Sequence, residues 1–339
     1  GAIAVDRIPA EMVEKIESLR SPTSDIDSEG IGGTLNIVLK EGARYQGGIW
    51  RLGAVHMEET DGSGFIGFTG MGETLEYNVS ANIQERHNPK SKVASKLDGD
   101  EREDVVESDV RDSRDVSVAG DAIVHLSDRA KLGFNLFYMD TERDEEENTR
   151  KNVFLRADSN SPFVLDEQTL ENQLEKIEQS NTNLGVNYDL ALARGELNLY
   201  AYSNQFEQDK TETNREADLG DPLELDEIEV TDIDDSDTRV GVAWKVDGES
   251  MTSKFGAEVS RREREFSVYV ADDSGVVDDE DDEFADFRAT IDGYDLYATS
   301  KMTLNPKWEV EAGVRAEYRD QQVEGRDFAG AKTGSDRDN

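Results

Sequence analysis

Cysteine is absent from the 339-residue chain, which also contains only six prolines and three histidines. Without cysteine, neither a disulfide framework nor a thiolate metal site can form. The chain has no continuous apolar run of about 18 residues, and this excludes a membrane-spanning helix. The first residues carry neither a basic nor an apolar segment of the secretory kind, so we expect any export signal to lie upstream.

Basic residues are scarce. The chain has 37 Lys and Arg against 77 Asp and Glu, which gives a formal net charge of -40. A protein that binds nucleic acid needs basic surface to displace counterions from the phosphates. A peripheral protein held on anionic lipid needs basic surface too. We therefore predict no nucleic-acid partner and no attachment of that kind.

Apolar residues are also few, at 35% of the chain, while charged residues make up 34%. A soluble domain with this composition would have a thin core and a heavily charged surface. Two interpretations remain open. Either much of the chain is disordered, or its strands bury only one face, as in a membrane barrel with a wet interior.

Residues 1–42 differ from the rest of the chain. A short helix is predicted over residues 8–14, with Pro9 near its start, where a missing N–H costs nothing. Alternation predicts strands over residues 15–20 and 33–40, separated by a loop rich in Ser, Asp, Pro and Gly.

From about residue 44 the pattern becomes that of long antiparallel strands. Apolar and polar side chains alternate over whole segments, which is the main signal for a strand with one buried face. The predicted apolar positions include Leu75, Tyr77, Val79, Ala81 and Ile83; Val116, Val118, Ala122, Val124 and Leu126; Leu132, Phe134, Leu136 and Tyr138; Leu184, Val186, Tyr188 and Leu190; Val240, Val242, Trp244 and Val246; and Trp308, Val310, Ala312, Val314 and Ala316.

The predicted connections fall into two sets. Short turn-like sequences occur near residues 70–73, 127–130, 193–195, 247–250 and 305–307. Long polar stretches alternate with them, near residues 88–113, 141–178, 206–238 and 271–285, and a last one begins near 319. Short turns at one end and long loops at the other are typical of bacterial outer-membrane barrels.

Eleven strands are predicted after residue 43. Closed bacterial barrels have an even number of strands, so we expect the last predicted strand to lack a partner. The predicted fold is mostly β: a partial transmembrane antiparallel β-barrel of about eleven strands, preceded by a small α+β unit over residues 1–42.

Two segments, Ile8 to Pro22 and Gly30 to Lys40, resemble the distal plug of TonB-dependent outer-membrane receptors. In that family an Ile-Pro start, a short helix, an Ile-Glu strand and an Arg-Gly-Pro turn precede a loop that ends in Gly-Gly-x-Ile-Asn-Ile. Ser21 stands where the family usually has Gly, and Ile26-Asp27 where Tyr-Gly is common. The resemblance implies structural and gating roles for Pro9, Arg20, Pro22, Gly32, Gly33 and Asn36.

The resemblance also implies the domain organisation and the function. Residues 1–42 would be the C-terminal part of the plug, and residues 43–339 the N-terminal half of the barrel. The whole receptor would sit in the outer membrane of a Gram-negative bacterium, in contact with its lipid. It would take up a scarce small molecule or metal chelate, by class a ferric siderophore, with oligosaccharides, peptides and cobalamin as alternatives. An inner-membrane energy-coupling complex would act through an upstream segment, and we expect this fragment alone to be inactive.

No residue pattern identifies the ligand, a resident metal, a cofactor or a catalytic site. The acidic stretches lack the spacing of a calcium loop, so they are either solvated segments or attractors of cations. His56, His87 and His125 are scattered along the chain. Arg20 either pairs with a carboxylate such as Glu76 or Glu311, or ends a strand in solvent.

One alternative comes from a different class of protein. A secreted acidic β-rich adhesin or cation-binding surface module would have the same composition. It would pack its apolar faces against each other in a sandwich, without two distinct sets of connections. The alternation and the asymmetry of the connections favour the receptor over this module.

Overall fold

The computed structural model describes residues 13–19, 34–39, 46–218, 220–272, 284–305, 307–326 and 332–338. Within these ranges every regular element is a strand, and no helix is long and apolar enough to cross a membrane. The strands are β1 Val13–Leu19, β2 Thr34–Leu39, β3 Gly47–His56, β4 Thr60–Met71, β5 Leu75–Asp98, β6 Glu101–Ser127, β7 Ala130–Leu155, β8 Val164–Leu192, β9 Gly195–Asp218, β10 Glu224–Asp247, β11 Met251–Asp272, β12 Phe284–Asn305, β13 Trp308–Arg326 and β14 Lys332–Asp338.

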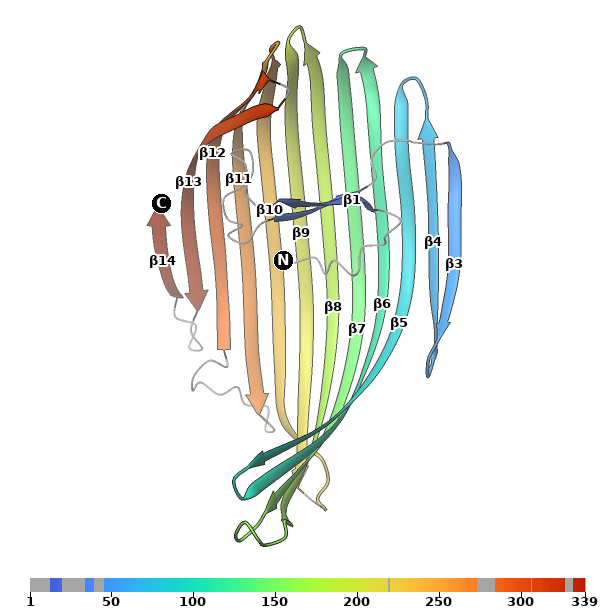
Figure 1. Cartoon of the computed structure of the whole chain (residues 1–339), viewed down its shortest axis with the longest axis vertical. Coiled ribbons are helices and arrows are strands. Elements are labelled where there is room, and N and C mark those ends of the chain that lie inside the picture. The colour runs from blue at the N-terminus through green and yellow to red at the C-terminus, as the bar shows by residue number, and fades with distance from the viewer. Residues whose placement is uncertain are drawn as a thin grey trace.

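Twelve of the strands form one sheet in which each strand pairs with its neighbours in sequence. The order runs from β3 to β14 without a crossover, and all pairs are antiparallel. Figure 1 shows the strands side by side, with the connections that follow β4, β6, β8, β10 and β12 gathered at one end of the sheet. The sheet is not closed, because β3 and β14 are its two edges. The mostly β class is therefore confirmed.

The first two strands form a separate antiparallel pair. Residues Ile16 and Ile37 lie opposite each other in this pair. The predicted strands over residues 15–20 and 33–40 are thus confirmed in outline. The predicted helix is wrong at its last two residues, because β1 begins at Val13, and the rest of it lies outside the described residues. The domain boundary after residue 42 stays a prediction.

The two faces of the large sheet differ in chemistry. We call the face that carries Leu75, Tyr77 and Val79 the apolar face, and the opposite one the polar face. The register aligns the apolar positions of successive strands, since Val118 pairs with Tyr138, and Ala81 with Val118. No second sheet among the described residues covers this face. Its side chains are exposed, among them Leu75, Tyr77, Val79, Phe134, Leu136, Leu184, Val240, Trp244, Leu296 and Val310.

The short connections lie where the sequence predicts them. The turn between β8 and β9 uses Gly195 at a φ of +100°, and the tip between β5 and β6 uses Gly99 at a φ of +62°. Glycine adopts such left-handed conformations without the steric penalty that a Cβ adds. Tight two-residue hairpins require them.

Three of the predicted long loops are wrong. Residues 88–113, 141–178 and 206–238 are mostly strand, with connections reduced to 99–100, 156–163 and 219–223. The fourth predicted loop, 271–285, stays a prediction, because residues 273–283 lie outside the described part. The polar stretches pair because cross-strand charges stabilise them, for example Lys92 with Glu107 at 2.7 Å.

The extensions of β5–β8 form an arm, which we define as residues 88–110 and 146–174. In Figure 1 these hairpins reach beyond the ends of the other strands, at the end opposite the short turns, and twist across one another. At the tip, Arg156 donates from Nε to Asp100 Oδ1 at 2.9 Å and from its backbone N to Asp100 O at 3.0 Å. This residue joins the two hairpins of the arm.

The end of the chain also corrects one expectation. The eleven predicted strands are present as β3–β13, but β13 continues to Arg326 instead of giving way to a loop near 319. It then pairs with β14, so that Val323 lies opposite Ser335. The expectation of an unpaired last strand is wrong, because a twelfth strand follows it.

Candidate functional site

Most of the motif residues predicted for the plug cannot be placed. Pro9, Arg20, Pro22, Gly32 and Gly33 lie outside the described residues. The sixth, Asn36, lies in β2 opposite Glu17 of β1. Of the two carboxylates suggested for Arg20, Glu76 lies on the polar face and its Oε1 is 2.8 Å from Nε2 of His125. The proposed pairing of Arg20 stays a prediction.

The polar face carries a network of amides and tyrosines on β8 and β9. Asn183 Nδ2 donates to Asn181 Oδ1 at 2.6 Å, and Asn204 Nδ2 donates to Asn183 Oδ1 at 2.8 Å. Tyr202 donates its hydroxyl hydrogen to Asn183 Oδ1 at 2.6 Å. Such groups lose no hydrogen bonds in a wet interior and would be costly in contact with hydrocarbon.

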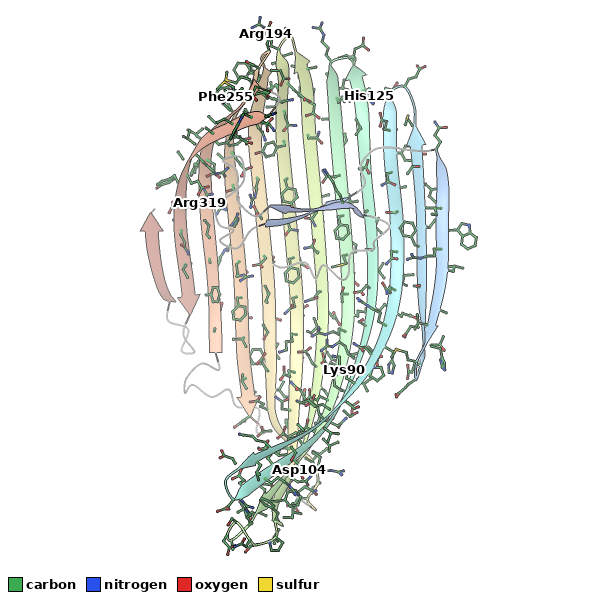
Figure 2. The ribbon with its side chains drawn as sticks, viewed as in Figure 1. Lys90, Asp104, His125, Arg194, Phe255 and Arg319 are labelled. Carbon is green, nitrogen blue, oxygen red and sulfur yellow. The ribbon has the colours of Figure 1, made fainter. Side chains whose placement is uncertain are left out.

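A cluster of charges lies on the same face at β12 and β13. Asp295, whose side chain is 1% exposed, accepts from Arg319 Nη1 at 2.6 Å and contacts Arg315 Nη2 at 2.9 Å. Arg319 also reaches the second oxygen of Asp295, at 3.2 Å, which makes the contact bidentate. Figure 2 labels Arg319 on β13. A buried carboxylate held by two guanidinium groups is fixed in orientation.

A row of four glutamates crosses the polar face. It lies nearer to the arm than the segments, such as residues 132–138, in which apolar side chains alternate with polar ones. The Cα positions of the glutamates lie directly opposite one another on β7, β8, β9 and β10. Opposed like charges destabilise a sheet unless cations separate them. The row consists of Glu145, Glu175, Glu212 and Glu229.

Three cations lie between these glutamates and complete a charge ladder. Arg111 Nε donates to Glu145 Oε2 at 2.7 Å, and Arg143 donates to Glu175. Lys210 Nζ contacts Glu212 at 2.7 Å, as well as Glu229 at 3.2 Å and Glu175 at 3.5 Å. The ladder therefore joins β6 to β10 with three positive and four negative groups.

The ladder changes the pKa of its two central members, Lys210 and Glu212. Burial opposes the charge of Lys210, but its hydrogen bonds to Glu212 and Glu229 outweigh burial and raise its pKa. Burial likewise works against ionised Glu212, yet the hydrogen bond and the charge of Lys210 lower its pKa. Both groups are therefore charged at neutral pH.

An acidic cavity of about 170 Å³ lies next to the ladder. Burial raises the pKa of Glu216, and the nearby carboxylates of Glu171 and Asp226 raise it further. One cation, Arg215, also lines the cavity. No group of three or more His, Asp or Glu side chains in the described ranges is arranged to hold a metal ion.

The three histidines do not come together. His56 Nδ1 lies 2.9 Å from Thr60 Oγ1 across the turn between β3 and β4. His87 Nδ1 lies 2.7 Å from Asp112 Oδ1, and this hydrogen bond raises the pKa of His87. His125 lies near the short turns, as Figure 2 shows. Each has an ordinary polar partner, and no shared ligand site results.

Sequence reasoning missed the charge ladder. Its local signal is a basic residue two positions from a glutamate, as in Arg143 with Glu145 and Lys210 with Glu212. Residues two apart lie on the same face of a strand. The partners on neighbouring strands depend on register, which the sequence does not reveal.

A search of family models finds none that matches the chain, and a search of curated proteins finds no match. We therefore base the functional proposal on the two faces of the sheet and on the motif resemblance in residues 8–40.

Proposed function

We propose that this chain forms part of the wall of a Gram-negative outer-membrane receptor that takes up a scarce ligand by energy-coupled transport. The observation that carries the proposal is the exposed apolar face, whose side chains align from β4 to β13 while polar side chains occupy the other face. Exposed apolar surface of this extent on a soluble protein would be an aggregation liability. In an outer-membrane wall it contacts lipid.

The height of the apolar band supports a membrane location. Leu75 and Ile83 are eight residues apart, as are Val116 and Val124. That spacing is about 26 Å along a strand at about 3.3 Å per residue. With a tilt of about 40°, the band is about 20 Å high, close to the roughly 25 Å apolar band of outer-membrane barrels.

The two ends of the sheet differ, and this difference supports one orientation of the sheet across the membrane. Short turns belong to the periplasmic end of such barrels, and long extensions belong to the extracellular end. The arm and the charge ladder would then face the medium and meet the ligand first. Residues 1–42 would plug the interior, and an inner-membrane complex would move them. The ligand proposed by class is a ferric siderophore.

The adhesin alternative receives less support from the same observations. It requires apolar side chains packed between two sheets. The described residues form one large sheet whose apolar side chains, such as Leu296 at 63% exposed, remain open.

The experiment that tests the proposal compares two neighbouring positions on β5. Val79 lies on the apolar face and Asn78 on the polar face of the same segment. We expect Val79→Arg to cost about 2–4 kcal/mol of stability in lipid vesicles and to remove the protein from the outer-membrane fraction of a Gram-negative host. Asn78→Arg places the same charge in the wet interior and should leave insertion unchanged.

A separate measurement, retention of the ligand by vesicles, tests the proposed ligand class. Transport is not expected of this fragment alone, but binding of the ligand by the arm is: outer-membrane vesicles that contain the protein, or the Asn78→Arg variant, should retain radiolabelled ferric siderophore above the level of empty vesicles. Recovery of the unaltered protein in the soluble fraction would overturn the membrane location. Insertion without retention of any ferric siderophore tested would overturn the ligand class alone.

A further inference from the structure

The edge of β5 is open along the arm. β4 pairs with β5 only as far as Ser63 opposite Gln84. Slightly further on, the backbone N of His87 donates to Asp61 Oδ2 at 2.9 Å. From there β5 continues to Asp98 with β6 on one side and no described strand on the other.

The open edge presents a regular series of backbone groups. In a strand, alternate residues direct their N–H and C=O groups to the same side. His87 directs its N–H towards β4, so the odd-numbered residues after it direct theirs to the open edge. Pro89 has no N–H. The series of free donors therefore consists of Ser91, Val93, Ser95 and Leu97.

The side chains of these residues make one face of the edge uncharged and partly apolar. Val93 is 79% exposed, the largest value among the exposed large apolar residues, and Leu97 is 62% exposed. Val106 of β6 lies opposite Val93 and is 47% exposed. Together these three side chains form an apolar strip beside the free backbone.

On the other face, the outermost row of side chains, which belongs to β5, is basic, while the row behind it on β6 carries Asp109, Glu107 and Glu103. Residues 86–98 hold four Lys or Arg and one Asp, a net charge of +3 with His neutral, within a chain of net charge -40. Lys90 contacts Asp109 at 3.3 Å and Lys92 contacts Glu107 at 2.7 Å, yet their side chains remain 48% and 62% exposed. An ammonium group has three donors, so each can bind a second carboxylate.

We propose that the open edge of β5 in the arm binds an extended acidic peptide segment of a partner protein by strand addition. The backbone of the segment pairs with residues 91–97. Its apolar side chains lie over Val93 and Leu97, and its carboxylates on the other face meet Lys90, Lys92 and Lys96. Main-chain hydrogen bonds supply affinity in this mode, and the alternate side chains supply specificity.

Lysine and proline on an edge strand also prevent unselective pairing between sheets. Here they restrict the partner. Pro89 ends the series of donors at one side, and the lysines repel a basic strand. The proposal goes beyond the proposed uptake function and does not depend on it, because the open edge lies outside the apolar band.

The test uses the folded protein and a fluorescent peptide of roughly eight residues that alternates Val with Glu. Ser95→Pro is the informative variant. It removes one outward N–H and spares the pairing with β6, since proline is tolerated where a strand's N–H faces solvent. Ser95→Ala is the matched control and keeps the N–H. Fluorescence anisotropy measures binding, and far-ultraviolet circular dichroism checks folding.

We expect the protein and Ser95→Ala to bind the peptide equally, and Ser95→Pro to bind it about tenfold more weakly. A peptide labelled with ¹³C at its carbonyls should show the amide I shift of β pairing on binding. Lys96→Glu provides a second variant, which keeps the backbone donor. It should lower the affinity for the Glu peptide and raise the affinity for a peptide that alternates Val with Lys.

Three results would overturn the proposal. One is the absence of binding to the unaltered protein. Another is equal binding by Ser95→Ala and Ser95→Pro when both are folded. The last is equal affinity of the unaltered protein for the Glu and Lys peptides, because the edge would then show no preference for acidic segments.

Discussion

At the scale of single residues, a glycine under a tyrosine ring fixes the packing of the polar face. A Cβ added to Gly241 would lie 2.3 Å from Cζ of Tyr200. Tyr200 in turn donates to Glu258 Oε2 at 2.6 Å. Gly241→Ala should force the ring aside and break that hydrogen bond, at a cost of about 1–3 kcal/mol. Urea unfolding in lipid vesicles measures the loss.

The control for this substitution is another strand glycine. A Cβ added to Gly120 of β6 would meet its nearest atom, Cγ1 of Val79, at 3.6 Å, an ordinary contact. Gly120→Ala should therefore change the unfolding midpoint little or increase it. An equal loss for Gly120→Ala and Gly241→Ala would show that the ring contact is not the cause.

Lys210 sets the pH dependence of the charge ladder. Its charge lowers the pKa of Glu212 below the ordinary 4.5. A lowered carboxyl pKa adds stability above the unfolded value, and that stability is lost as the pH falls through the folded value. Lys210→Met should cost about 2 kcal/mol at about pH 7, and the difference from the unaltered protein should shrink below about pH 4.

An exposed pair serves as the control for the ladder. Lys245 contacts Asp247 at 3.4 Å, and both side chains are about half exposed. Lys245→Met should cost less than about 0.5 kcal/mol at any pH. If Lys210→Met were equally mild, or if its effect did not depend on pH, the ladder would contribute nothing beyond an ordinary surface pair.

At the scale of elements, the short turns were predictable and the lengths of the strands were not. Alternation identifies a strand only where its two faces meet different surroundings. In the arm both faces carry polar side chains, so a segment such as residues 146–152 has the pattern of a polar loop. Pairing in the arm depends on partners from neighbouring strands, such as Lys92 with Glu107. Their register is a long-range property.

The tip of the arm depends on Arg156. Besides its two bonds to Asp100, it donates from Nη2 to Gly99 O at 3.0 Å. Its guanidinium also lies 4.9 Å from the ring centre of Phe163. Arg156→Ala should release one hairpin tip from the other, at a local cost of about 1–3 kcal/mol. Hydrogen exchange at residues 97–104 should become faster.

Arg150 of β7, six residues before Arg156, offers a control. Its side chain makes no hydrogen bond or ion pair with another described residue. Arg150→Ala should leave exchange at the tip unchanged. If Arg156→Ala left it unchanged as well, the two hairpins would be held together by their backbone pairing alone.

At the scale of the whole molecule, the sequence predicted the two-faced sheet and the order of its hairpins. Both follow from local patterns, such as the alternation of Leu132 to Tyr138 and the turn at Gly195. The sequence did not predict β14, because residues 332–338 contain no alternating apolar positions. It also did not predict the ladder around Lys210, because five strands contribute to it.

Three residues on the polar face show a further limit of prediction from the sequence. Phe65, Phe137 and Met139 form a small buried apolar cluster there. A prediction that the whole face is polar therefore misses the few places where large apolar side chains pack on the polar face. The candidate site as a whole was predictable as a polar face, but not residue by residue.

The proposed function depends most on which surroundings each face of the sheet meets. Because the chain has no cysteine, single cysteines at positions 75–80 can each carry a spin label on the protein in lipid vesicles. Collision rates should alternate: oxygen, which dissolves in lipid, should dominate at Leu75, Tyr77 and Val79, and a water-soluble nickel chelate at the positions between them. Exclusion of both reagents at those three residues, or access of the chelate to them, would contradict the account.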